Sequence, residues 1–250
     1  MSGQDFFIGW AETSERDRRF FMKAGLGLMA GTGVMAAGVA ALQNRAGKGT
    51  WDQGDVREWR GIATSEPYAM LRTADLNGVP HTALLSCLGK CGVAAQIGAL
   101  AGKPVVVKGS LIQRGPHAMI AVAEDTNWIR ADEERAESAN AFPSLETIGA
   151  MTLRGEILDS KCWFGAMRPS EGKVHKACAS LCIRGGLPPA FFARDKKGRG
   201  ALMIMTDGGA AHGPDLLPFV ADPVSVTGQL RRWGEMLVLD GPPSSFRRLA

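Results

Sequence analysis

The segment Pro104-Val-Val-Val-Lys-Gly-Ser-Leu111 has a counterpart in Pro223-Val-Ser-Val-Thr-Gly-Gln-Leu230. In both segments two valines, a glycine and a leucine occupy alternate positions, which is the period-two pattern of a β-strand with one buried face. An arginine, a glycine and then a methionine follow each copy, at Met119 and Met236. We therefore predict, in each copy, a strand that turns into a hairpin.

The similarity between the two halves of the chain extends beyond these strands. Each half has an Arg-Gly segment first, then a Cys-x3-Cys motif, and then the strand: Arg60-Gly61-Ile62 with Cys87 and Cys91, and Arg154-Gly155-Glu156-Ile157 with Cys178 and Cys182. Shared order at this spacing indicates an internal repeat. The second copy then contains an insertion of about 28 residues between its cysteines and its proline.

This repeat predicts the domain organisation. We expect a first β-rich repeat over residues 45–130 and a second over 149–250, joined by a charged helical linker over 131–148. The strand with its central glycine is similar to the central strands of small OB-type barrels, where glycine permits the bend that closes the sheet. The resemblance implies a mainly β protein with a few short helices, built as two tandem OB-like barrels.

An uncharged segment precedes the first repeat. Residues 24–44 contain no charged side chain, and as a helix they match the roughly 30 Å of bilayer hydrocarbon. We expect a retained transmembrane signal anchor here, with residues 1–23 as a cytoplasmic tail that carries an apolar cluster at 6–10. Cleavage is the alternative, because Val39-Ala40-Ala41 satisfies the small-residue rule for signal peptidase.

The residues just before this segment suggest an export route. Arg18-Arg19-Phe20-Phe21-Met22-Lys23 resembles the twin-arginine motif, whose characteristic residues would be Arg18, Arg19, Phe21 and Lys23. The resemblance implies that the twin-arginine translocase exports the folded chain. More basic residues precede the span than follow it, which favours a single-pass inner-membrane protein with its bulk in the periplasm.

The same N-terminal arrangement carries a second resemblance. Rieske iron–sulfur subunits also combine a twin-arginine motif, one retained helix and an exported domain, and the likeness covers about the first 45 residues. It implies a non-catalytic or electron-transfer subunit of a membrane redox complex, with a b-type cytochrome or a quinone-linked oxidoreductase as partner. The alternative function is a non-redox structural or assembly module with disulfide-stapled OB-like domains.

A cysteine and histidine constellation lies in the second repeat. His175, Cys178 and Cys182 fall on one face of a helix expected over 174–184, and Cys162 lies just after a predicted strand. Three thiols and one imidazole suit zinc or an iron–sulfur cluster. These four residues are therefore the predicted metal ligands.

Two other interpretations of the cysteines stay open. In an oxidising compartment Cys162 can pair with Cys178 or Cys182, whereas two cysteines one helical turn apart are poorly placed to bond. All three can also be reduced core residues. Cys87 and Cys91 have no counterparts of Cys162 and His175, so they are either a disulfide or the remnant of a lost site.

Composition limits the remaining functions. The 250 residues are 45% hydrophobic and 22% charged, which excludes a disordered chain and a multi-span membrane protein. The net charge of +4 is spread along the sequence rather than clustered, so nucleic acid is not an expected partner. The sequence has no P-loop and no nucleophile elbow. His117 and His212 stand alone in turn-rich segments and are expected to be solvated.

Overall fold

The computed structural model describes residues 13–44, 49–74, 76, 78, 81–134, 144–195 and 200–249. It divides the chain into two units, Met1–Ala46 and Gly47–Ala250. Each unit is described separately below. The apolar cluster at 6–10 lies outside the described residues.

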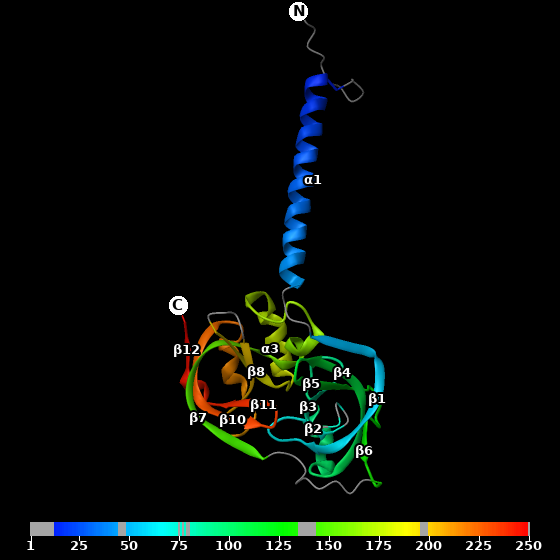
Figure 1. Ribbon diagram of the computed structural model, residues 1–250, viewed down its shortest axis with the longest axis vertical. Coiled ribbons are helices and arrows are strands. Elements are labelled where there is room, and N and C mark those ends of the chain that lie inside the picture. The colour runs from blue at the N-terminus through cyan, green and yellow to red at the C-terminus, as the bar shows by residue number, and fades with distance from the viewer. Residues whose placement is uncertain are drawn as a thin grey trace, which may run out of the picture. The chain divides into compact units, whose positions relative to one another are not determined.

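The first unit contains one long helix, α1 (Glu15–Asn44) (Figure 1). The Ser14 side chain accepts a hydrogen bond from the Asp17 amide at 3.2 Å, which caps the first turn. By length and apolar composition the helix can cross a membrane. The four residues of the predicted export motif lie in its first turns, so residues 15–23 and the predicted span form one continuous helix. Arg19 also pairs with Glu15 at 3.0 Å.

The second unit begins with a closed barrel of five strands. In sheet A the strands follow the order β1-β2-β3-β5-β4-β6, and β1 also pairs with β4, which closes the barrel (Figure 1). The β3–β5 pair is parallel and the other pairs are antiparallel. The strands are β1 (Thr50–Thr64), β2 (Met70–Thr73), β3 (His81–Ser86), β4 (Pro104–Arg114), β5 (His117–Val122) and β6 (Ile129–Ala131).

Sheet B contains the other six strands and has a matching set of pairings. Here β7 pairs with β8 and with β10. Strand β9 pairs with β8 and, in parallel, with β11, and β11 also pairs with β10. The strands are β7 (Leu145–Asp159), β8 (Pro189–Arg194), β9 (Gly200–Thr206), β10 (Pro223–Trp233), β11 (Met236–Asp240) and β12 (Phe246–Arg248). The predictions of a mainly β fold and of strands at 104–111 and 223–230 are confirmed.

Short helices fill the connections between strands. They are α2 (Ala94–Ile97), η1 (Gly98–Leu100), the π-helical turn η3 (Cys162–Ala166), η4 (Lys173–His175), α3 (Lys176–Arg184), η5 (Pro214–Phe219) and η6 (Pro243–Ser245). The helix expected over 174–184 is therefore present as η4 and α3. In the expected linker helix, residue 131 ends β6 and 132–134 are not helical; 135–143 lie outside the described residues.

The two Arg-Gly segments identified in the sequence occupy corresponding strand positions. Gly61 faces Val105 across β1 and β4, and Gly155 faces Val224 across β7 and β10. A Cβ at Gly61 would lie 2.1 Å from the Arg72 carbonyl oxygen, and one at Gly155 would lie 2.3 Å from that of Phe192. Both glycines therefore allow a neighbouring strand to approach closely.

The two Cys-x3-Cys motifs do not correspond in the fold. Cys87 and Cys91 follow β3, in the connection to β4, whereas Cys178 and Cys182 lie on α3, in the connection between β7 and β8. The predicted equivalence of the two motifs is therefore wrong. The first motif follows the third strand of sheet A, whereas the second follows the first strand of sheet B, so the matching cysteine spacing arises in connections that differ in position.

One apolar core is shared by the two sheets. It contains Tyr68, just before β2, and Met70 of β2, and it continues through Trp163 to Phe192 and Ile204 of sheet B. Each sheet also has one further apolar cluster of its own. Polar contacts reinforce the junction, since the Tyr68 hydroxyl donates to the Met205 carbonyl at 2.8 Å. The sheets thus form one compact unit.

His117 lies in this junction, and the prediction that it is solvated is wrong. Its ring stacks on Phe164 and meets Trp163 edge-on, with both ring centroids 5.5 Å away. Burial, with smaller effects from His81 and Arg114, lowers the pKa of His117 to about 4. His212 is also only partly exposed.

This pKa predicts a dependence of stability on pH. Between the ordinary value of 6.5 and about 4 the unfolded state binds more protons than the folded state, so stability falls as the pH falls through that window. In His117→Gln we expect the free energy of unfolding to fall by about 2 kcal/mol less than in wild type as the pH falls through this window. Urea unfolding of both metal-free proteins at pH 7, 5.5 and 4.5 measures it, and parallel stability curves would contradict it.

Candidate functional site

Three cysteines from separate elements come together beside the shared core. Cys162 begins η3, which starts three residues after the last residue of β7, and Cys178 and Cys182 lie one turn apart on α3. All three are free thiols, and their sulfurs lie within 4.8 Å of one another. Cys162 and Cys182 are 4% and 1% exposed, whereas Cys178 is partly exposed. One edge of the cluster therefore reaches the surface.

The spacing of the sulfurs suits a single metal ion. The Cys162 and Cys178 sulfurs are 3.8 Å apart, too far for a disulfide. Two thiolates bound tetrahedrally to one zinc, each with a bond of about 2.3 Å, would be about 3.8 Å apart. Iron–sulfur clusters distribute their cysteines over two or more irons, so three cysteine sulfurs of one cluster do not all lie as close together as these three do. The geometry therefore favours one ion over a cluster.

His175, the fourth predicted ligand, lies beside the cluster. Its Nε2 is hydrogen-bonded to Asp159 Oδ2 at 2.9 Å, and both side chains are buried. The other carboxylate oxygen of Asp159 accepts the Cys162 amide at 2.8 Å. His175 thus joins Asp159 and Cys162 in a second group of possible ligands. The structure brings the three predicted cysteines together and places His175 next to Cys162.

A loop of sheet A covers the cysteine cluster. Cys87 and Cys91 form a disulfide in this loop, which is not helical. Lys90, between them, donates to the Cys178 sulfur at 2.7 Å, and this hydrogen bond raises the pKa of Lys90. Of the two interpretations of Cys87 and Cys91, the disulfide is therefore confirmed, whereas a disulfide from Cys162 to Cys178 or Cys182 is not formed. A non-helical loop lets cysteines four residues apart bond, and Cys162 stays free.

Lys161 binds the same loop through its side-chain ammonium. Its ammonium donates to the carbonyl oxygens of Cys87, Leu88 and Gly89, the last two at 2.9 and 2.8 Å. Burial lowers the pKa of Lys161 to about 8. Lysines from both sheets therefore link the disulfide loop to the free cysteines.

The two buried thiols differ in their acidity. Cys162 has a raised pKa because it donates a hydrogen bond to Cys182 and because it is buried. The pKa of Cys182 is lowered, chiefly by that hydrogen bond and, to a smaller degree, by the positive charge of Lys90. Cys182 is therefore the more easily ionised member of the pair. Metal binding requires that such protons leave.

Close backbone packing completes the site. The Gly92 amide donates to the Gly185 carbonyl at 2.7 Å, where the end of α3 meets the disulfide loop. A Cβ at Gly185 would lie 1.8 Å from the Lys90 carbonyl oxygen, and one at Gly92 would lie 2.4 Å from that of Gly186. Glycines are needed for the two chain segments to approach this closely.

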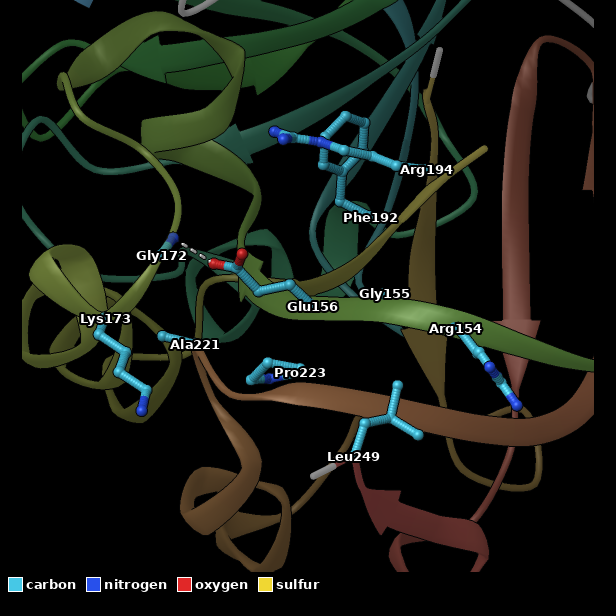
Figure 2. Close-up of a pocket in the computed structure, with 10 residues that line it drawn as sticks. All are labelled: Arg154, Gly155, Glu156, Gly172, Lys173, Phe192, Arg194, Ala221, Pro223 and Leu249. Carbon is cyan, nitrogen blue, oxygen red and sulfur yellow. Dashed lines mark hydrogen bonds between the residues drawn. The ribbon is translucent and has the colours of Figure 1, made fainter. Parts of the chain in front are cut away.

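A cleft of about 390 Å³ opens beside β7, away from the cysteine cluster. Figure 2 shows the Glu156 carboxylate directed at the Gly172 amide and Arg194 lying against Phe192. Burial raises the pKa of Glu156, and Arg194 pairs with Glu171. Three basic residues and one carboxylate line the cleft, Arg154, Lys173, Arg194 and Glu156, so its lining is mainly basic.

Comparison with known proteins adds no assignment: the sequence matches no protein-family model, and no curated protein is significantly similar to it. Sequence reasoning missed three residues of the site, Lys90, Asp159 and Lys161. The signal for two of them was present, since Asp159 and Lys161 adjoin Cys162 in Asp159-Ser-Lys-Cys162. Lys90 needed the contact between the sheets, which no local pattern indicates.

Proposed function

We propose that this protein is a membrane-anchored, exported subunit of a membrane redox complex that binds one soft metal ion through Cys162, Cys178 and Cys182. The observation that carries the metal site is the 3.8 Å separation of two free sulfurs, with the third sulfur within 4.8 Å of both. That separation fits one thiolate-bound ion.

The proposed placement depends on the N-terminal unit. Helix α1 serves as the retained anchor. The twin-arginine translocase exports the chain by recognising Arg18, Arg19, Phe21 and Lys23. The unit Gly47–Ala250 then lies in the periplasm. Transport of a folded chain is compatible with a metal bound before export. A b-type cytochrome or quinone-linked oxidoreductase is the proposed partner, as the Rieske-like N-terminal plan implies.

We further propose that the exported unit is a tandem of OB-like barrels. Support comes from the matching pairing order of sheets A and B, with a parallel β3–β5 pair in one and a parallel β9–β11 pair in the other. The glycine-to-valine pairings of the two halves also agree in register. The connection between β7 and β8 then carries the site as an addition to the second barrel.

Metal analysis of the detergent-purified full chain, prepared without oxygen, tests the proposed site. We expect about one equivalent of bound soft metal after loading and dialysis, and none in the triple variant Cys162→Ser, Cys178→Ser, Cys182→Ser. The matched control is Cys87→Ser with Cys91→Ser, which removes two sulfurs and retains the three proposed ligands. Equal metal content in wild type and the triple variant would contradict the site.

A second candidate function is a non-redox assembly module. Two observations favour it, namely the Cys87–Cys91 disulfide and the participation of Cys162 and Cys182 in the shared apolar core. In that case the cysteines are packing residues, and their replacement by alanine changes stability without any loss of metal. A chain that stays metal-free after loading supports this candidate.

A further inference from the structure

A fourth sulfur lies at the exposed edge of the cysteine cluster. Met167 Sδ is 3.5 Å from the Cys178 sulfur, and the Met167 side chain is 43% exposed. Met167 follows η3, where Gly165 has a φ of 153° that turns the chain after Cys162 and Trp163. This turn returns the backbone to α3, so the thioether meets the more exposed thiol of the cluster.

The nearby nitrogen and oxygen donors do not belong to the group of three sulfurs. Nε2 of His175 and both carboxylate oxygens of Asp159 make hydrogen bonds within the buried group, and His175 lies within ligand distance of Asp159 and Cys162 but is not grouped with Cys178 and Cys182. Lys90 and Lys161 are hydrogen-bond donors and not expected ligands. Among the described residues, the donors left around the cluster are therefore three thiols and one thioether.

Such a donor set discriminates between metals. Zinc takes thiolate, imidazole and carboxylate ligands, and thioether is not among its usual donors. Thiolates together with thioethers select Cu(I), which accepts three or four soft donors. We therefore propose that the site is selective for Cu(I), with Met167 as a fourth sulfur ligand at the solvent edge; this inference rests on the proposed metal site.

The exposure of the ligands also defines an entry path. Cys162 and Cys182 are buried, whereas Cys178 and Met167 reach solvent. A copper ion therefore arrives at Met167 and Cys178 first and then acquires the buried thiolates. Loss of the thioether weakens copper binding and leaves the three thiolates intact.

Competition between ions tests the selectivity. The full chain in detergent is loaded with one equivalent of Zn(II) without oxygen, and one equivalent of Cu(I) is then added, with the chelator bicinchoninate reporting free copper. We expect Cu(I) to displace Zn(II), and Met167→Leu to weaken Cu(I) binding about tenfold without changing Zn(II) binding. Met151→Leu, on β7, is the matched control and behaves as wild type.

The outcomes separate this inference from the function beneath it. Retention of Zn(II) against equimolar copper, or unchanged copper affinity in Met167→Leu, overturns the Cu(I) inference and leaves a metal site. Binding of neither ion overturns the proposed site itself. Copper-edge X-ray absorption gives a second measurement, in which sulfur-only coordination supports the inference and a nitrogen ligand from His175 overturns it.

Discussion

Replacing Gly185 by alanine is expected to separate the disulfide loop from α3 and to lower the free energy of unfolding by about 3 kcal/mol. The new Cβ would lie 1.8 Å from the Lys90 carbonyl oxygen, a backbone atom, so the loop must move. Movement of that loop draws the Lys90 ammonium away from the Cys178 sulfur, now 2.7 Å away. We therefore expect metal affinity to fall together with stability.

Gly213→Ala is the matched control for this substitution. Gly185 and Gly213 have nearly equal φ values, −76° and −77°, and a Cβ at Gly213 meets nothing within 4 Å. Alanine at Gly213 should change the unfolding free energy by no more than about 0.5 kcal/mol. Chemical unfolding and metal competition measure both variants. Equal results for the two would show that the loop does not press on α3.

Replacing Lys161 by methionine should also destabilise the junction between the sheets, by about 3 kcal/mol. The side chain is only 3% exposed and satisfies three carbonyl oxygens of the disulfide loop. Methionine preserves the length and removes the only donor group of the side chain, which leaves those carbonyls unpaired. The unfolding temperature should fall by about 6–12 °C.

The surface residue Lys176 provides the control for this prediction. Its side chain is 41% exposed and pairs with Asp222 at 3.2 Å, so Lys176→Met should cost no more than about 1 kcal/mol. Calorimetry of the full-length variants in detergent gives the comparison. If Lys161→Met unfolds at the wild-type temperature, the loop is held by other contacts.

Local patterns predicted the elements that depend on local physics. Alternating valines predicted β4 and β10, because a strand with one buried face must alternate, and the run before Gly185 predicted α3. Helical periodicity correctly placed Cys178 and Cys182 on one helix, and Cys162 lies just past a strand, as predicted. The uncharged run predicted a helix that can span a membrane.

The remainder depended on contacts between distant segments. Cys87 and Cys178 appeared equivalent because motif order was preserved, yet their connections join different strands. His175 has the correct helical spacing for a ligand, but Asp159 binds its ring nitrogen. Lys90 reaches Cys178 only because the sheets share a core, and a sequence pattern carries no information on that contact.

Because the two sheets share a core, both halves of the chain contribute to the surroundings of the cysteine cluster. Cys162, Cys178 and Cys182 belong to the second half of the chain, whereas Lys90 and the disulfide loop come from the first, so the complete pocket exists only after both halves have folded and docked. The proposed ligands all come from the second half, whereas the hydrogen bond from Lys90 to the Cys178 sulfur at 2.7 Å forms only after docking. An ion would therefore stabilise the docked state only to the extent that it binds more tightly to the docked chain than to the second half alone.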